Sequence, residues 1–342
     1  MTAGTDPVAA PTTFVSTGAL PDASQVQIQV DEAHRRCRGV LDGEVSSVYP
    51  ALAVAEPDRF GVCVVATSGA THVAGDADVA FPVMSVAKPF VFALVCDALG
   101  AQGVRRRLGV NATGLPFNSV AAVERAGGPT NPMVNPGAIA AVSLAPGDDA
   151  DGRWRFLADG LSRFAGRPLE LDVEVLDSAL ATNHRNHAIA RLLESFGALG
   201  SDPAEATEVY TRACSLSVTA RDLAVMGATL ADGGVNPVTG EQVVDRETCR
   251  HTLAVMATAG MYETSGDWLF DVGMPAKSGI GGGIVTVAPG KGALGTYSPR
   301  LDPAGNSVRG QLVAALLARS LGLDLFSSDP APGERPRRTG PE

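Results

Sequence analysis

The stretch from Ser85 to Leu99 constrains the fold most strongly, because apolar residues occupy most faces of the helix that it predicts. The stretch ends at Gly100, and glycine commonly terminates helices. A helix that is apolar on most faces has to be surrounded by other elements. The chain has 342 residues, 45% of them hydrophobic, which is enough for one large core or two lobes around such a helix.

Short strands are predicted near both ends of the chain, and helices are predicted between them. Residues 60–67 read as a buried strand, and a turn at 68–70 followed by a second short strand makes a hairpin. This order predicts an α/β (α+β) fold, in which both chain ends build a mixed lobe and a helical lobe is inserted. Helical periodicity covers residues 139–144, 173–195, 220–231 and about 306–321, and β-rich runs cover 283–288 and 293–297.

The two ends of the chain differ in composition from the rest. Residues 1–22 are rich in Ala, Pro, Thr and Gly, and residues 327–342 are rich in Pro, Gly and Arg. Neither end has helical or strand periodicity, so both are predicted to be disordered tails. The ordered domain is therefore expected at 23–326.

Composition also limits the partners and the location of the protein. The net charge is −10 and the estimated pI about 5.0, so a nucleic-acid partner is not expected. No apolar stretch is long enough to span a membrane and the N-terminus lacks the features of a signal peptide, so a cytoplasmic protein is expected. The five cysteines are scattered and never in a C-x-x-C spacing, and we interpret them as buried thiols.

Two polar residues stand at the start of the apolar helix. Ser85 lies three residues before Lys88, which places both side chains on one helical face. A lysine whose pKa is lowered by burial can accept the proton of the serine hydroxyl and so activate it as a nucleophile. The spacing alone also fits an N-cap serine followed by a surface lysine.

A second motif, Lys277-Ser278-Gly279, lies at the end of the helical region and directly before a predicted strand. Two such motifs in this order are the arrangement of the serine β-lactamase and penicillin-binding superfamily, whose chemistry is acyl transfer. The glycines at 279 and 281–283 allow a strand edge to approach a substrate closely. A backbone N–H there and that of Ser85 would form an oxyanion hole.

Beyond these motifs, the sequence resembles the glutaminases of this superfamily from about residue 30 to residue 326. The resemblance implies a β-lactamase-like fold and a glutaminase-like catalytic domain of two lobes. It also implies hydrolysis of L-glutamine to L-glutamate and ammonia without a metal or organic cofactor, by a homo-oligomer, either a dimer or a tetramer. The matching blocks are residues 74–79, 114–119, 131–139, 185–186, 210 with 214–215, 260–262, 275–279 and 305–310.

The same resemblance implies roles for individual residues. Ser85 would be the nucleophile, Lys88 its base, and Tyr262 a second group for proton transfer. The implied glutamine contacts are Ser85, Asn135, Asn186, Tyr210, Tyr262 and the backbone N–H of Ile280, and Tyr49 and Lys277 are further candidates.

Among the departures from the family pattern, which include a one-residue shift of Tyr49, Met84 in place of glutamine and Ile280 in place of valine, the one at position 179 bears most on the substrate. The glutamate that holds the substrate ammonium in the family is replaced by Ala179. Loss of such a charge-assisted hydrogen bond weakens binding by about 1.5–3 kcal/mol. Two alternatives to a glutaminase therefore stay open: an amidohydrolase of the same fold with a changed substrate, and a weakly active paralogue that binds an amino acid.

Several of these residues also have structural interpretations. Asn135 precedes Pro136-Gly137 and would fit a helix cap, and Tyr210 and Tyr262 would fit a core. His184 and His187 lie three residues apart, but no nearby Cys or carboxylate pair completes a metal site. No metal ligands are therefore predicted.

Overall fold

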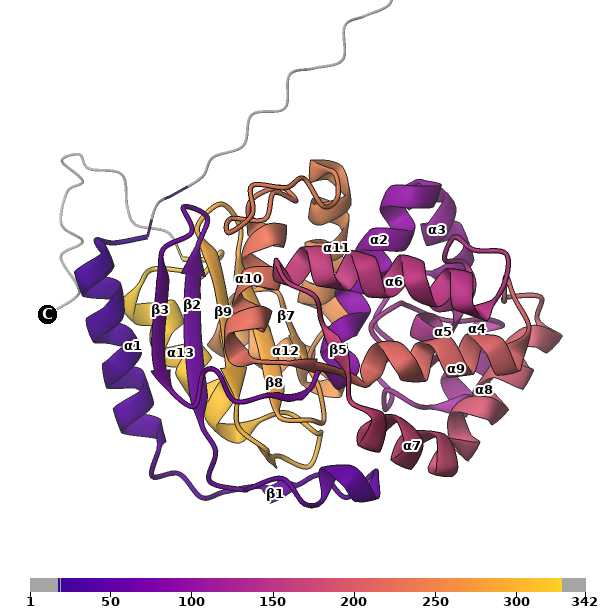
Figure 1. Cartoon of the computed structure of the whole chain (residues 1–342), viewed down its shortest axis with the longest axis horizontal. Helices are drawn as coiled ribbons and strands as arrows, with labels where there is room; N and C mark the ends of the chain where they lie inside the picture. The colour runs from indigo at the N-terminus through magenta and orange to yellow at the C-terminus, as the bar shows by residue number, and fades with distance from the viewer. Residues whose placement is uncertain (1–17, 19, 328–342) are drawn as a thin grey trace, which may run out of the picture.

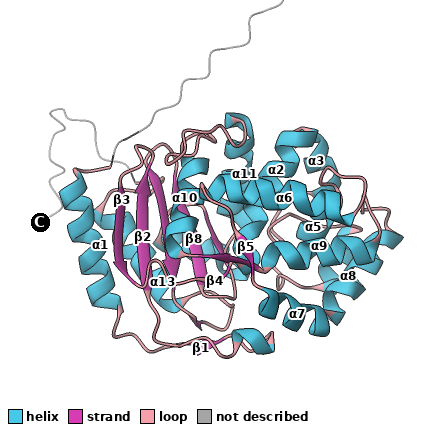
Figure 2. Cartoon of the chain, in the orientation of Figure 1, coloured by secondary structure: helices cyan, strands magenta, loops and turns pink. Residues whose placement is uncertain are grey.

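The computed structural model describes residue 18 and residues 20–327. The tails predicted at 1–22 and 327–342 lie almost wholly outside these residues. Within them, an α/β lobe and a helical lobe lie side by side (Figure 1; Figure 2), as the order of the predicted elements indicated.

A five-stranded antiparallel sheet forms the centre of the α/β lobe, in the order β3-β2-β9-β8-β7. The predicted hairpin is β2 and β3, and its partner β9 comes from the other end of the chain, so both ends build one sheet. The strands are β2 (Gly61–Ala66), β3 (Thr71–Gly75), β7 (Ala276–Ser278), β8 (Gly283–Ala288) and β9 (Gly292–Tyr297).

Both faces of this sheet are covered by helices. Alternate residues of β2 point to opposite faces. Val62 and Val64 join the core beneath α1 (Ala23–Cys37) and α13 (Val308–Ser320), whereas Cys63 and Val65 join the core on the side of α10 (Ala220–Ala231). Double coverage explains why β2 is apolar along its whole length.

The helix α2 (Ala87–Leu99) lies at the centre of the helical lobe, and its residues from Ala87 to Cys96 are all buried. It packs against four neighbouring helices, as its apolar composition required. No helix of the described part combines the length and apolar character needed to cross a lipid bilayer. The neighbours are α3 (Ala101–Leu108), α5 (Asn135–Ser143), α6 (Ala150–Ala165) and α11 (Arg246–Ala259).

The continuous helix predicted over 173–195 is wrong, because the structure has two helices, α7 (Val173–Thr182) and α8 (His184–Ser195). They meet at Asn183, whose side chain is buried and bonded to neighbouring side chains. The apolar periodicity runs on across the junction, so the sequence pattern carries no sign of the break.

Short elements connect and flank these parts. Two small sheets occur, β4-β6-β5 and β1-β10. The strands are β1 (Glu44–Val45), β4 (Phe81–Pro82), β5 (Glu170–Leu171), β6 (Leu216–Val218) and β10 (Arg300–Leu301). The remaining helices are α4 (Val120–Ala126), α9 (Pro203–Cys214) and α12 (Ser265–Asp271), with the 3-10 turns η1 (Pro50–Leu52), η2 (Met84–Val86) and η3 (Tyr262–Thr264).

Ser85 lies in η2, between β4 and α2, rather than in the α-helix that was predicted to begin with it. The segment leaving β4 is held by a hydrogen bond from Val83 N to Leu216 O, 2.8 Å long. Met84 then turns the chain with φ of 47°. This tight turn delays the start of α2 to Ala87. A second difference concerns Lys277 and Ser278, which lie inside the edge strand β7 rather than before a strand.

Candidate active site

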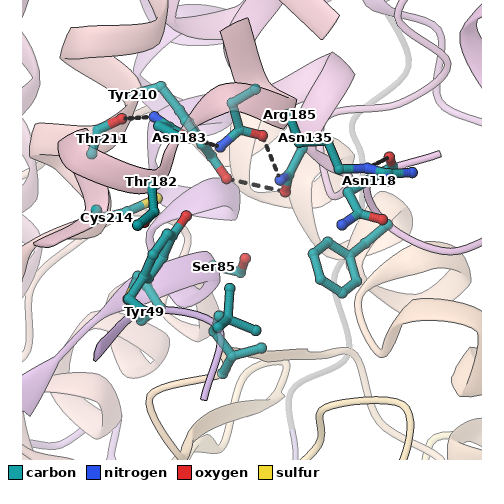
Figure 3. Close-up of a pocket in the computed structure, with 16 residues that line it drawn as sticks. Tyr49, Ser85, Asn118, Asn135, Thr182, Asn183, Arg185, Tyr210, Thr211 and Cys214 are labelled. Atoms are coloured by element: carbon teal, nitrogen blue, oxygen red, sulfur yellow. Dashed lines mark hydrogen bonds between the residues drawn. The ribbon is translucent and has the colours of Figure 1, made fainter. Parts of the chain in front are cut away.

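A cavity of about 160 Å³ opens beside Ser85. In Figure 3 the Ser85 hydroxyl points into the open space between Tyr49, Tyr210 and Asn135. Met84 has a left-handed backbone conformation, which is uncommon for a residue other than glycine. The turn therefore aims the Ser85 side chain out of the lobe and into the cavity.

Lys88 lies one helical turn after Ser85 and is only 2% exposed. Its Nζ donates to Asn135 Oδ1 at 2.7 Å. Burial lowers the pKa of this amine to about 8. The interpretation of an N-cap serine followed by a surface lysine is therefore wrong: Val86 occupies the cap position, and a substantial fraction of a buried amine with this pKa is neutral near pH 7–8.

Tyr262 approaches Ser85 from η3, with φ of 58°. Its hydroxyl donates to Ser278 O at 3.1 Å. Burial raises the pKa of the phenol, and a hydrogen bond with the Ser85 side chain acts in the opposite direction. The nucleophile candidate thus has a protonated phenol on one side and a lysine of lowered pKa on the other.

Lys277 is a second fully buried amine. Its Nζ donates to Ser278 O at 2.6 Å and lies 4.1 Å from the centre of the Tyr262 ring. Burial, reinforced by the positive charge of Lys88, holds its pKa well below the ordinary value. The neutral form of the Lys277 amine is therefore favoured.

The glycine-rich segment after β7 packs directly against the turn that carries Ser85. A Cβ on Gly279 would lie 3.0 Å from Val83 O and 3.3 Å from Ser85 N, so a larger residue would require these neighbours to shift by a few tenths of an ångström. Among the hydrogen bonds of the described residues, none uses the backbone N–H of Ser85 or of Ile280. Both donors are therefore available to an oxygen bound beside the serine.

Asn135, at the start of α5, connects Lys88 to polar side chains of α8 and α9. Its Oδ1 accepts from Lys88 Nζ and from Tyr210 OH, the latter at 3.1 Å, while its Nδ2 donates to Asn186 Oδ1 at 2.9 Å. Val134 is the N-cap residue of α5, and no side-chain cap bond is found there. The cap interpretation of Asn135 is therefore wrong, and its side chain serves the cavity wall.

The hydrogen bonds continue from Asn186 into residues that sequence reasoning missed. Asn186 Nδ2 donates to Asn183 Oδ1 at 2.6 Å, and Asn183 Nδ2 donates to Thr211 Oγ1 at 2.7 Å (Figure 3). Asn183 lies within a stretch of helical periodicity, where asparagine is unfavourable, and this was the same signal that singled out Asn186 as a candidate site residue. The other missed lining residues are Val48, Met84, Phe117, Asn118, Thr182, Arg185, Thr211 and Cys214.

Tyr49 also lines the cavity, from the loop before η1. Burial raises the pKa of its phenol to about 12. Ala179 lies on α7, is 1% exposed and contributes only a methyl group to the wall. Ala51 N donates to Ser178 Oγ at 3.1 Å, which fixes the Tyr49 loop against α7.

The structure brings together all the residues predicted for the site. Tyr49, Ser85, Asn135, Asn186, Tyr210 and Ile280 line the cavity, and Lys88, Tyr262 and Lys277 are buried around the serine. His184 and His187 are exposed. The described residues contain no group of three or more His, Cys, Asp or Glu side chains that could hold a metal ion.

Comparisons with known proteins agree with this arrangement. The family model described as glutaminase matches residues 43–326. The chain is similar to Glutaminase 2 of Yersinia pestis, with 62% identity over 318 residues, 93% of this chain and 94% of that protein. A solved structure of a probable glutaminase, ybaS, has a TM-score of 0.89 and 41% identity and covers 90% of this chain and 100% of that one. The structure of Mglu in its glutamate form has a TM-score of 0.82 and 38% identity and covers 89% of this chain and 70% of that one.

Proposed function

Because this chain belongs to the glutaminase family and has its β-lactamase-like fold, it is a glutaminase, and we propose that Ser85 is the nucleophile with which it hydrolyses L-glutamine. The products are L-glutamate and ammonia. The observation that carries the proposal is the position of the Ser85 hydroxyl, which points into the cavity and is flanked by Lys88 and Tyr262.

In the first half of the reaction, Ser85 Oγ attacks the side-chain amide carbon while its proton passes to the neutral Lys88 amine. The negative charge on the amide oxygen is stabilised by the backbone N–H groups of Ser85 and Ile280. The C–N bond then breaks, and Tyr262, with Lys88, supplies the proton with which ammonia leaves. A glutamyl ester on Ser85 is the result.

In the second half, water attacks the ester carbonyl, and the proton that it loses restores the Ser85 hydroxyl as glutamate departs. The same pair of N–H groups stabilises the second oxyanion. Each step uses only groups of this chain and water, so we propose catalysis without a metal or organic cofactor.

The rest of the glutamine molecule would contact the polar wall formed by Asn135, Asn186, Tyr210 and Tyr49. Several fixed polar groups in a small cavity are what recognition of an amino acid requires. A solved structure of the similar protein Mglu is described as its glutamate form, which supports the proposal that this chain binds a glutamyl group.

The test measures ammonia release from L-glutamine by the wild type, by Ser85→Ala and by Cys214→Ala. Cys214 is the control because it is the other nucleophilic side chain that lines the cavity, but burial raises its pKa and leaves it an unreactive thiol. Loss of activity in Ser85→Ala alone is expected, and acid-quenched protein should carry a glutamyl group on Ser85. Activity that survives in Ser85→Ala would refute the proposed nucleophile.

We also propose that the enzyme acts in the cytoplasm as a homo-oligomer, a dimer or a tetramer. Both proposals rest on the resemblance to the family. Light scattering coupled to size-exclusion chromatography of the full chain measures the oligomeric state, and a monomer at micromolar concentration would contradict that proposal.

A further inference from the structure

The cavity wall contains one charged side chain. Among the described residues that line the cavity, Arg185 is the only cation and no carboxylate occurs. Its Nε donates to Asn118 O at 2.8 Å. Two more amines, Lys88 and Lys277, are buried behind the wall. The electrostatic environment of a bound ligand is therefore neutral to positive.

A glutamine zwitterion brings three polar groups into such a site. Its amide faces Ser85, and its carboxylate is an anion that suits a cavity with positive charges around it. Its ammonium needs acceptors, and a carboxylate is the strongest partner that a protein provides for an ammonium. The described wall offers this group only neutral oxygens.

These neutral oxygens are in part already engaged. Asn183 Oδ1 accepts from Asn186 Nδ2, and Asn135 Oδ1 accepts from Lys88 Nζ and Tyr210 OH, whereas the Thr182 hydroxyl donates to Ser178 O at 2.9 Å and can still accept. The Tyr49 phenol has no hydrogen bond to a described residue. In Figure 3, Tyr49 and Thr182 lie on the side of the cavity opposite Arg185 and Asn118.

The carboxylates of α7 do not reach this side. Glu174 and Asp177 are exposed and absent from the cavity wall. Ala179, between Asp177 and Thr182, is the α7 position whose side chain is both buried and on the wall. The buried position that α7 contributes to the wall therefore carries a methyl group and no charge.

We infer that this site recognises the amide and the carboxylate of its substrate but not a positive charge on the α-carbon. The inference rests on the proposed function and extends its substrate class. The class comprises ω-amides of five-carbon dicarboxylic acids whose α-carbon bears hydrogen, hydroxyl or oxo oxygen in place of ammonium. The reaction is unchanged: amide and water give carboxylic acid and ammonia.

The experiment compares kcat/KM for ammonia release from L-glutamine and from glutaric acid monoamide, which lacks the α-amino group. A carboxylate partner for the ammonium would favour glutamine by about tenfold to over a hundredfold. Wild-type enzyme is expected to favour glutamine by less than about tenfold. A preference of tenfold or more overturns the inference, and it does so without touching the assignment of glutaminase activity.

Two variants identify the position responsible. Ala179→Glu is expected to shift the ratio of the two kcat/KM values toward glutamine by about tenfold or more. Ala181→Glu adds the same charge at an exposed position of the same helix and should leave the ratio unchanged. An equal shift in both variants, or none in Ala179→Glu, overturns the assignment of selectivity to position 179. Should Ala179→Glu fail to fold, the wild-type ratio still decides the inference. If wild-type enzyme releases no ammonia from glutamine, the proposed function fails first.

Discussion

Replacement of Lys88 by methionine should abolish catalysis and at the same time stabilise the fold. Burial lowers the pKa of Lys88 from 10.5 to about 8, a difference that corresponds to about 3 kcal/mol of destabilisation. Because the folded-state pKa is below the unfolded one, this cost is present in full below pH 8 and disappears as the pH rises through 10.5. Methionine keeps most of the apolar stem and carries no charge.

The substitution also removes one hydrogen bond. Asn135 Oδ1 loses the Lys88 donor but keeps Tyr210 OH, so it is not left without a partner. A lost hydrogen bond costs about 1 kcal/mol. The net expectation for Lys88→Met at pH 7 is a gain of about 1–2 kcal/mol, seen as a melting temperature higher by about 2–5 °C.

Thermal denaturation of wild type, Lys88→Met and Lys291→Met between pH 7 and pH 10 measures this effect. Lys291 is the control lysine, since it lies near the surface and donates to Gly322 O. Its replacement should change stability by no more than about 0.5 kcal/mol. The stabilisation by Lys88→Met should shrink as the pH rises. A lower melting temperature than in the control, or a difference that does not change with pH, would refute the assignment of a destabilising buried amine.

Three further predictions follow from the same geometry. If neutral Lys88 is the base, kcat/KM for glutamine should rise about tenfold per pH unit below the Lys88 pKa of about 8 and level off above pH 8. A pH profile of kcat/KM that is flat between pH 6 and 8 would exclude Lys88 as the base. Tyr262→Phe should lower kcat by about 10²–10⁴-fold in steady-state assays with little change in KM, whereas an effect confined to KM would make Tyr262 a binding residue only. Gly137→Ala should destabilise the fold by about 1–3 kcal/mol in thermal denaturation, because the added Cβ would collide with Asn131 O. The control Gly103→Ala, in an open helical position, should stabilise the fold by about 0.5–1 kcal/mol. Equal effects of the two substitutions would contradict the close approach of Gly137 to Asn131 O.

Local patterns were sufficient to predict the main elements and to single out Ser85 as a nucleophile candidate. The all-round apolar character of α2 required a central position, and the helix is central. The spacing of Ser85 and Lys88, read together with Lys277-Ser278-Gly279, predicted one site, and the structure brings these segments together.

Features that depend on contacts between distant segments were not predictable in the same way. The break at Asn183 is made by its bonds to Asn186 and Thr211, and the apolar period gives no hint of them. Similarly, the displacement of Ser85 from the α-helix into η2 follows from the turn at Met84 after β4 pairs with β6. Neither contact can be derived from the helix or strand propensities of single residues.

The cavity draws its two kinds of residues from separate stretches of the chain. The groups proposed to react come from residues 84–88, 262 and 277–280, whereas another part of the cavity wall comes from residues 179–186 at the junction of α7 and α8. Substitutions at this junction are therefore expected to alter substrate selectivity without displacing the groups that we propose break the amide bond. Such separation gives gene duplicates an easy route to diverge, and it confines a useful mutagenesis library to the short segment 179–186.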